Sequence, residues 1–125
     1  MTKETLSVLS EKVREEEDPE VLLSEIFKFI NLEPAMIAIY FKLLHSEKAM
    51  TVTDLKGALT YSERTIRKYL KDMLDTGYIK RTTIEEERPC YAYFAVSPKK
   101  VWQKLVSEVR KVRKRATKAF GKYNG

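Results

Sequence analysis

The chain has little of the chemistry that enzymes and metal proteins require. Its 125 residues include one cysteine and one histidine, so Cys90 cannot form an intramolecular disulfide and the two cannot make a structural zinc site. We interpret Cys90 and His45 as ordinary structural residues, although a dimer would leave an intermolecular disulfide or an oxidant-sensing role open for Cys90. No Gly-rich phosphate loop and no nucleophile paired with a base is present, so we expect no enzymatic activity, no cofactor and no metal.

Glycine and proline are also scarce, with four of each, while 43% of the residues are apolar. This composition excludes a disordered or fibrous chain and predicts one folded domain with a single modest core. No apolar run approaches the roughly 20 residues of a membrane span, and the N-terminal MTKETLSVLSEK lacks the apolar core of a signal peptide. We therefore expect a cytoplasmic protein with no membrane partner.

The positive charge is concentrated at one end of the chain. Residues 98–125 carry ten Lys and Arg against the single acid Glu108, whereas the first 97 residues hold 14 cations and 17 acids. A polyanion would therefore be attracted most strongly to the C-terminal end.

Helix start and stop signals divide the N-terminal half into three helices. Residues 3–17 are weakly amphipathic and end in an acidic run, which opposes the helix dipole and predicts a frayed helix. Asp18 is the expected N-cap of the next helix, with Pro19 at its first position. The third helix, 34–45, is apolar nearly all round and is expected at the centre of the core.

A short helix at about 53–59, capped by Thr53, precedes the most informative stretch. Thr60 and Glu63 have the spacing of a capping box, and Gly77 supplies a left-handed stop. Between them, apolar residues at helical spacing predict one buried stripe: Ile66, Leu70, Met73 and Leu74.

After Gly77 the pattern changes to β-branched and aromatic residues. Two such runs, 78–84 and 90–96, flank a polar connection and predict a β-hairpin. Ser97 and Pro98 then begin a last helix that runs to about residue 119.

Together these elements predict a mostly α fold with a β-hairpin wing, a winged helix-turn-helix with a long C-terminal coiled-coil-like dimerisation helix. We expect N-terminal helices in 1–30 that support the dimer or the core, the winged helix-turn-helix in 31–97, and the basic dimerisation helix and tail in 98–125. In such a unit the second helix of the pair enters the major groove. Its outward face would carry Ser62, Glu63, Arg64, Arg67, Lys68 and Lys71.

The run LHSEKAMTVTDLKGALTYSERTIRKYLKDMLDTGYIKR, followed by ERPCYAYFAVSPKKVWQKLV, resembles the DNA-binding half of TrmB-like archaeal transcription regulators. It is similar also to the small single-domain winged-helix regulators of archaea, over roughly residues 31–106. The resemblance implies sequence-specific binding of double-stranded DNA as a dimer. It also implies base contacts by Ser62, Arg64, Thr65 and Lys68.

Two departures limit what the resemblance implies. The longer TrmB-like regulators continue into an effector-binding domain that senses sugars, so we expect no sugar sensing from this chain. The wing tip begins Glu85-Glu86-Glu87, and these carboxylates would be repelled by a phosphate backbone. Phosphate contacts are expected from the surrounding cations and polar groups: Thr53, Tyr61, Arg67, Lys71, Lys80, Arg81 and Arg88.

The last helix has the a/d rhythm of a coiled-coil seam. Its seam residues are spaced 3, 4, 3, 4, 3 apart: Trp102, Leu105, Val109, Val112, Ala116 and Ala119. At 1.5 Å per residue, some 22 residues reach roughly 33 Å, beyond the body of a small winged helix. A symmetric homodimer, parallel or antiparallel, is the simplest partner. Alternatively, Trp102 and Leu105 pack on the domain and the basic tail is loose.

Three functions fit this sequence. We favour a nucleoid-associated transcription regulator that binds a roughly palindromic site as a homodimer. An architectural chromatin protein with little sequence preference would also use a basic helix. A winged-helix protein-interaction module would not require the cations at Arg64 and Lys68.

Overall fold

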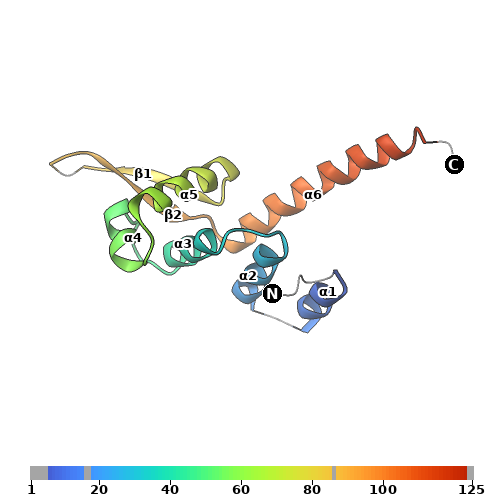
Figure 1. Cartoon of the computed structure of the whole chain (residues 1–125), viewed down its shortest axis with the longest axis horizontal. Coiled ribbons are helices and arrows are strands. Elements are labelled where there is room, and N and C mark those ends of the chain that lie inside the picture. The colour runs from blue at the N-terminus through green and yellow to red at the C-terminus, as the bar shows by residue number, and fades with distance from the viewer. Residues whose placement is uncertain (1–5, 16–17, 86, 124–125) are drawn as a thin grey trace.

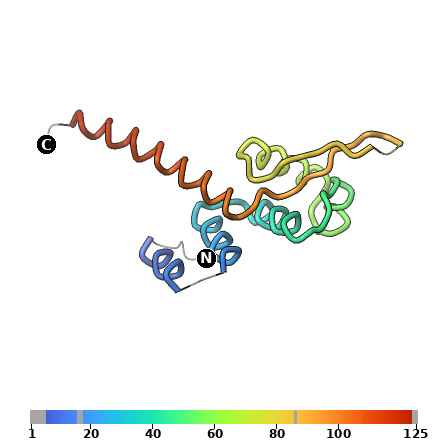
Figure 2. The backbone as a smooth tube through the Cα atoms, turned by 180° about the vertical axis from the view of Figure 1, so that it is seen from behind, coloured from blue at the N-terminus to red at the C-terminus, as the bar shows by residue number. Residues whose placement is uncertain are grey.

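The computed structural model describes residues 6–15, 18–85 and 87–123. In chain order the elements are α1 (Leu6–Glu15), α2 (Pro19–Phe29), α3 (Pro34–Leu44), α4 (Val52–Ala58), α5 (Glu63–Thr76), β1 (Ile79–Ile84), β2 (Cys90–Ala95) and α6 (Pro98–Phe120). The body contains α3, α4, α5 and the hairpin, and α1 and α2 lie below the root of α6, which projects away from the body (Figures 1 and 2). The predicted winged helix-turn-helix with a long C-terminal helix is confirmed.

Several helix boundaries follow the local signals. The Asp18 side chain accepts a hydrogen bond from the Glu20 backbone N–H at 2.9 Å, and Pro19 occupies the first turn of α2. Gly77 ends α5 with a φ of 81°. This left-handed backbone conformation is unfavourable for residues that have a Cβ atom. These predicted boundaries are confirmed.

Two other predicted helix starts are wrong. The N-cap of α4 is Thr51, which forms a reciprocal capping box with Asp54 at 3.1 and 3.0 Å. Thr53 therefore lies inside the first turn. The N-cap of α5 is Ser62 rather than Thr60, because the Ser62 side chain accepts from the Thr65 N–H at 3.2 Å.

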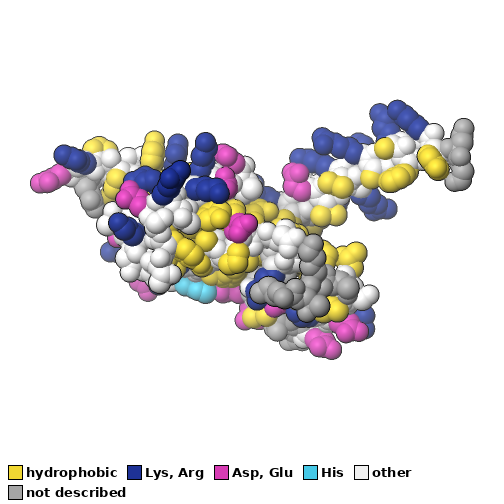
Figure 3. Space-filling view, viewed as in Figure 1, with side chains coloured by type: hydrophobic (Ala, Val, Ile, Leu, Met, Phe, Trp, Pro, Cys, Tyr) yellow, Lys and Arg dark blue, Asp and Glu magenta, His cyan; other side chains and the backbone are white. Residues whose placement is uncertain are grey.

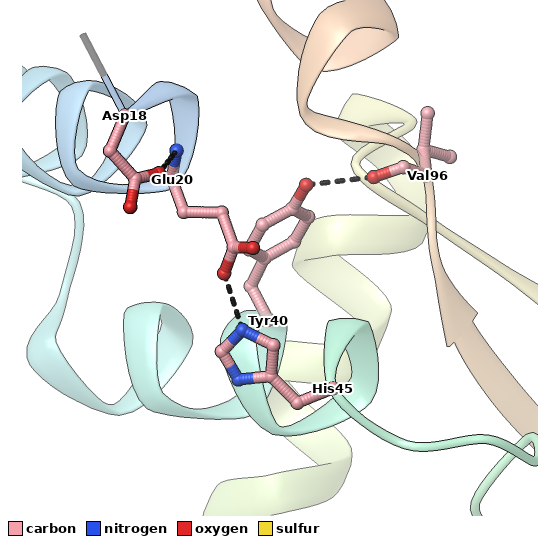
Figure 4. A network of polar contacts seen from close by, with 5 residues as sticks. All are labelled: Asp18, Glu20, Tyr40, His45 and Val96. Atoms are coloured by element: carbon pink, nitrogen blue, oxygen red, sulfur yellow. Dashed lines mark hydrogen bonds and ion pairs between the residues drawn. The ribbon is translucent and has the colours of Figure 1, made fainter.

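The core centres on α3, as its apolar composition predicts. Tyr40 is fully buried and packs edge-on against Phe27 of α2, with ring centroids 5.4 Å apart. Its hydroxyl donates to the Val96 carbonyl at 2.7 Å, which fixes the end of the hairpin to α3 (Figure 4). Burial, with a smaller contribution from Glu20, raises the pKa of the Tyr40 hydroxyl well above its ordinary value. The neutral hydroxyl therefore remains available as a donor.

His45 follows α3 and joins it to α2. Its Nε2 contacts the Glu20 carboxylate, and both side chains are substantially exposed (Figure 4). On α1, Lys12 Nζ lies 2.9 Å from Glu25 Oε2 of α2. These surface contacts tie the N-terminal helices to each other and to the body.

The hairpin is antiparallel, with Ile79 opposite Ala95 and Ile84 opposite Cys90. Met50 and Tyr93 exchange two backbone hydrogen bonds at 2.9 and 2.8 Å, so β2 is bordered on both sides. At the root of α6, Val101 is fully buried. Within the described ranges, no helix combines the length and hydropathy that a bilayer crossing demands.

Candidate nucleic-acid interface

The second helix of the helix-turn-helix, α5, has one buried face and one exposed face. Ile66, Leu70 and Met73 have exposed fractions of 0%, 1% and 0%. They pack with α3 and α4 into the common core. This burial fixes the rotation of α5 about its axis, and therefore fixes which side chains point to solvent.

Four cations occupy the exposed face of α5: Arg64, Arg67, Lys68 and Lys71. Their spacing of i, i+3, i+4 and i+7 places them together on one side of the helix. Figure 3 shows Lys and Arg side chains gathered over α5 in the same view in which cations cover the upper side of α6. The acids Asp72 and Asp75 follow toward the C-terminal end of α5.

Arg67 differs from the other three cations because it is already paired. Its Nε and Nη2 donate to Glu63 Oε1 at 3.0 and 2.8 Å. These hydrogen bonds, and the charge of Arg67, hold the pKa of the Glu63 carboxyl below its ordinary value. Arg64, Lys68 and Lys71 form no ion pair with any carboxylate in the described part of the chain.

The two hydroxyl residues expected to read bases lie against each other. Ser62 Oγ donates to Thr65 Oγ1 at 3.0 Å and accepts from the Thr65 backbone N–H. Ser62 is exposed, whereas Thr65 is half-buried. The structure thus brings Ser62, Thr65 and Arg64 together at the start of α5, and Lys68 follows one turn later.

The expected phosphate contacts near the turn differ in exposure. Thr53 is exposed in the first turn of α4, but Tyr61 is half-buried and packs against the core. Because it is half-buried, Tyr61 can present only part of its side chain to a ligand.

The ammonium group of Lys68 lies near an aromatic ring of the same helix. Lys68 Nζ is 5.3 Å from the centroid of the Tyr69 ring.

The wing places its expected contacts on the hairpin and its tip. Lys80, Arg81 and Arg88 are exposed. Arg81 lies over the Tyr91 ring, with its guanidinium carbon 4.1 Å from the centroid, an arrangement that holds the cation through its attraction to the ring face. At the tip, Glu85 and Glu87 are exposed, and Glu86 lies outside the described residues.

The expected seam of α6 divides into two parts. Leu105 is half-buried against the core, and Trp102 is 50% exposed. Further along, Val109 and Val112 are 65% and 66% exposed. Ala116 is half-exposed and Ala119 is exposed. The distal seam therefore has no cover from the described residues of its own chain.

Three features of the interface were missed in the sequence. The Thr51–Asp54 capping box has the S/T-x-x-D/E spacing and could have been found from it. The Glu63–Arg67 pair has the favourable i,i+4 order and was also recognisable. The stacking of Arg81 on Tyr91 depends on hairpin register, which the sequence alone does not set.

Among the residues that the structure describes, there is no group of three or more His, Cys, Asp or Glu side chains that could hold a metal ion.

Comparison with known proteins gives structural neighbours but no sequence relatives. No protein-family model matches the chain, and no curated protein matches it. A possible transcriptional regulator from Methanosarcina mazei Go1 superposes with a TM-score of 0.68 at 14% identity, covering 80% of this chain and 86% of that one. A protein from the thermoacidophilic archaeon Sulfolobus tokodaii gives a TM-score of 0.57 at 21% identity, with coverages of 86% and 97%.

A third solved structure, the multiple antibiotic resistance repressor MarR, gives a TM-score of 0.52 at 14% identity over 94% of this chain and 84% of that one. By their names, this neighbour and the Methanosarcina protein are a repressor and a possible regulator. At these identities the comparison shows the fold. It supports a winged-helix architecture without distinguishing TrmB-like proteins from other winged helices.

Proposed function

We propose that this protein is a transcription regulator that binds a specific, roughly palindromic double-stranded DNA site as a homodimer. The observation that carries the proposal is the exposed face of α5, where Arg64, Lys68 and Lys71 project without carboxylate partners in the described chain. Guanidinium and ammonium groups on a helix suit guanine edges and phosphates in the major groove. The names of two structural neighbours, a repressor and a possible regulator, support this choice.

We assign base reading to the start of α5, with Arg64 and Lys68 as the principal donors and Ser62 and Thr65 beside them. Ser62 already caps the helix, so its hydroxyl contributes mainly by holding Thr65. Thr53, Tyr61, Arg67, Lys71, Lys80, Arg81 and Arg88 would contact phosphates. In this proposal the resemblance to TrmB-like regulators extends to the DNA-binding unit only.

The test is selection of binding sites from a random pool of duplex DNA with the purified protein. We expect enrichment of a two-fold symmetric motif whose half-sites are about 34 Å apart, one helical turn. The variant Arg64→Ala/Lys68→Ala should enrich no motif. The matched control Lys42→Ala/Lys48→Ala removes two exposed cations outside α5 and the wing, and should enrich the same motif as the native protein.

A second candidate is an architectural DNA-binding protein, favoured by the distal half of α6, where residues 110–123 contain seven cations and no acid. It predicts tight binding without an enriched motif and with a steep salt dependence. If DNA of any sequence fails to bind, both candidates are contradicted and a protein-interaction module is the remaining function.

A further inference from the structure

We propose that two copies of this chain pair their α6 helices antiparallel, and that Phe120 and Tyr123 of each copy fill an apolar cleft at the root of α6 in the other. The inference rests on the homodimer of the proposed function. It adds the direction of pairing and the surface that receives the end of the helix.

The donor surface is the exposed apolar stripe of distal α6. Val109, Val112 and Phe120 of α6 have exposed fractions of 65%, 66% and 76%, and Tyr123, three residues beyond the end of the helix, is 78% exposed. In Figure 3 the hydrophobic side chains of this helix lie mainly along its lower edge, on the side of α1 and α2. Large apolar groups in one continuous stripe mark an interaction surface rather than scattered exposure.

The receiving surface is a cleft of about 490 Å³ between the N-terminal helices and the root of α6. Its lining is almost entirely apolar and includes Val13 of α1, Leu22 and Ile26 of α2, and Pro98 and Trp102 of α6. Trp102 is both a wall of the cleft and the first residue of the seam, so the two apolar surfaces are continuous. Aromatic side chains, which bury ~150–250 Å² each, suit such a space.

The spacing of the seam, 3, 4, 3, 4, 3, reads the same in both directions, so it permits antiparallel as well as parallel pairing, and the sizes of the paired residues decide between them. The antiparallel register pairs Trp102 with Ala119, Leu105 with Ala116, and Val109 with Val112. In two of these three pairs a large residue faces an alanine, and in the third two valines meet, so side-chain volume is distributed evenly along the seam. Parallel pairing would set alanine against alanine at the distal end and tryptophan against tryptophan at the root.

The same register determines what reaches the cleft. It places the partner's Phe120 level with Val101, and the partner's Tyr123, three residues beyond the end of α6, follows toward the Pro98 end. Pro98 and Trp102, on either side of Val101, both line the cleft. The end of one helix therefore arrives where the other copy has an apolar wall that the described residues of its own chain leave open.

The charges point the same way. Residues 98–109 of α6 hold three cations and one acid, whereas residues 110–123 hold seven cations and no acid. Parallel pairing would bring the two strongly cationic halves together, and like charges repel. Antiparallel pairing instead sets the cationic half beside the cleft edge that holds Val13 and Pro19, where the described residues of 11–20 include four acids and two cations.

The direction of pairing is tested by pulsed dipolar spectroscopy on spin-labelled full-length protein in a Cys90→Ser background. Gln103→Cys and Lys118→Cys place labels at exposed positions outside the seam. In an antiparallel dimer, two Gln103 labels or two Lys118 labels are separated by at least about 22 Å along the helices, because 15 residues rise 1.5 Å each. A mixture of the two proteins should give a clearly shorter distance.

Shorter distances within each single-label sample than in the mixture would mean parallel helices and would overturn this inference alone. A chain that sediments as a monomer at every concentration would overturn the homodimer as well. The site selection with Arg64→Ala/Lys68→Ala tests DNA reading independently of both results.

Occupancy of the cleft is tested by charge exchange between copies. Phe120→Glu and Leu22→Lys should each raise the dimer dissociation constant at least about tenfold, since each places a charge in a desolvated contact. Mixing the two variants should restore association to within about threefold of the native value, because one end of the mixed dimer is native and the other pairs opposite charges. The control Phe94→Glu alters an exposed aromatic on the wing and should leave the constant unchanged. If Phe120→Glu behaves like Phe94→Glu, the cleft does not receive Phe120.

Discussion

The helices α5 and α6 have similar amphipathic patterns but opposite surroundings. In α5 the apolar stripe is covered, with Leu70 1% exposed, whereas in α6 Val112 is 66% exposed. A hydrophobic period identifies an apolar face, but it does not say which surface covers it. In α5 the cover is the body itself, and in α6 we infer that the cover is a second copy.

The two helices also differ in how their charges are arranged. On α5 four cations share one face with acids at the far end, and Arg67 is held by Glu63. Distal α6 carries cations without acids. A patterned, fixed set of donors suits sequence reading, whereas a dense positive field suits contacts with phosphates of any sequence.

The largest effect on stability is expected from a substitution that disrupts the apolar stripe of α5. Leu70→Ala should lower the free energy of unfolding by about 2–5 kcal/mol, because it leaves a cavity in a fully packed core. Val112→Ala, which truncates an exposed side chain of the monomer, should change monomer stability by less than about 0.5 kcal/mol. Urea denaturation at protein concentrations that favour the monomer measures both. Equal losses for the two variants would contradict the distinction drawn between the helices.

A smaller effect is expected where the hairpin is fixed to the body that carries α5. Tyr40→Phe removes the donor to the Val96 carbonyl and leaves that buried acceptor unpaired. We expect a loss of about 1–3 kcal/mol in unfolding free energy. Exposed Tyr91→Phe is the matched control and should change stability little.

The same residue predicts a pH dependence. Burial raises the pKa of Tyr40 from an ordinary 10.0, so the folded state keeps the proton at pH values where the unfolded chain has lost it. The stabilisation from this group is complete below pH 10.0 and declines as the pH rises above it. Above that pH the native protein should lose stability more steeply than Tyr40→Phe. Parallel curves for the two proteins would show that Tyr40 does not contribute.

The smallest effect is expected from a substitution that makes the charge of α5 more like that of α6, by removing an acid beside its cations. Glu63→Gln removes the carboxylate that pairs with Arg67 and frees its guanidinium for a phosphate. We expect DNA affinity to rise about two- to tenfold for all sequences, with a salt dependence steeper by up to about one released counterion. Filter binding over a range of salt concentrations measures both quantities. A gain confined to one sequence would instead place Arg67 among the base-reading residues.

Much of the fold was predictable because its boundaries depend on local chemistry. Asp18, Pro19 and Gly77 act through their own backbone and side-chain geometry, so the sequence places them correctly. The starts of α4 and α5 were misplaced because Thr51, Thr53, Thr60 and Ser62 all have capping side chains. For α4 the capping-box spacing of Thr51 and Asp54 identifies the correct residue, whereas for α5 the same spacing of Thr60 and Glu63 points to the wrong one.

The candidate interface was predictable in its residues but not in its internal pairing. The outward face of α5 follows from the buried stripe, so the exposure of Arg64 and Lys68 was predictable, while their contact with bases stays a prediction. The mutual hydrogen bond of Ser62 and Thr65 depends on the corrected cap. The apolar cleft is lined by Val13, Leu22 and Trp102 from three helices. No local sequence pattern indicates that residues so far apart in the chain lie side by side in the fold.

The most direct measurement is the affinity of three proteins for the selected DNA site and for a shuffled duplex of equal composition. The native protein should prefer its site by about 10³-fold or more. Arg64→Ala/Lys68→Ala should lose that preference, while Lys114→Ala/Lys118→Ala on α6 should weaken binding to both duplexes by similar factors and keep it. A preference that survives the α5 substitutions, or that is lost with the α6 substitutions, would contradict the assignment of sequence reading to α5.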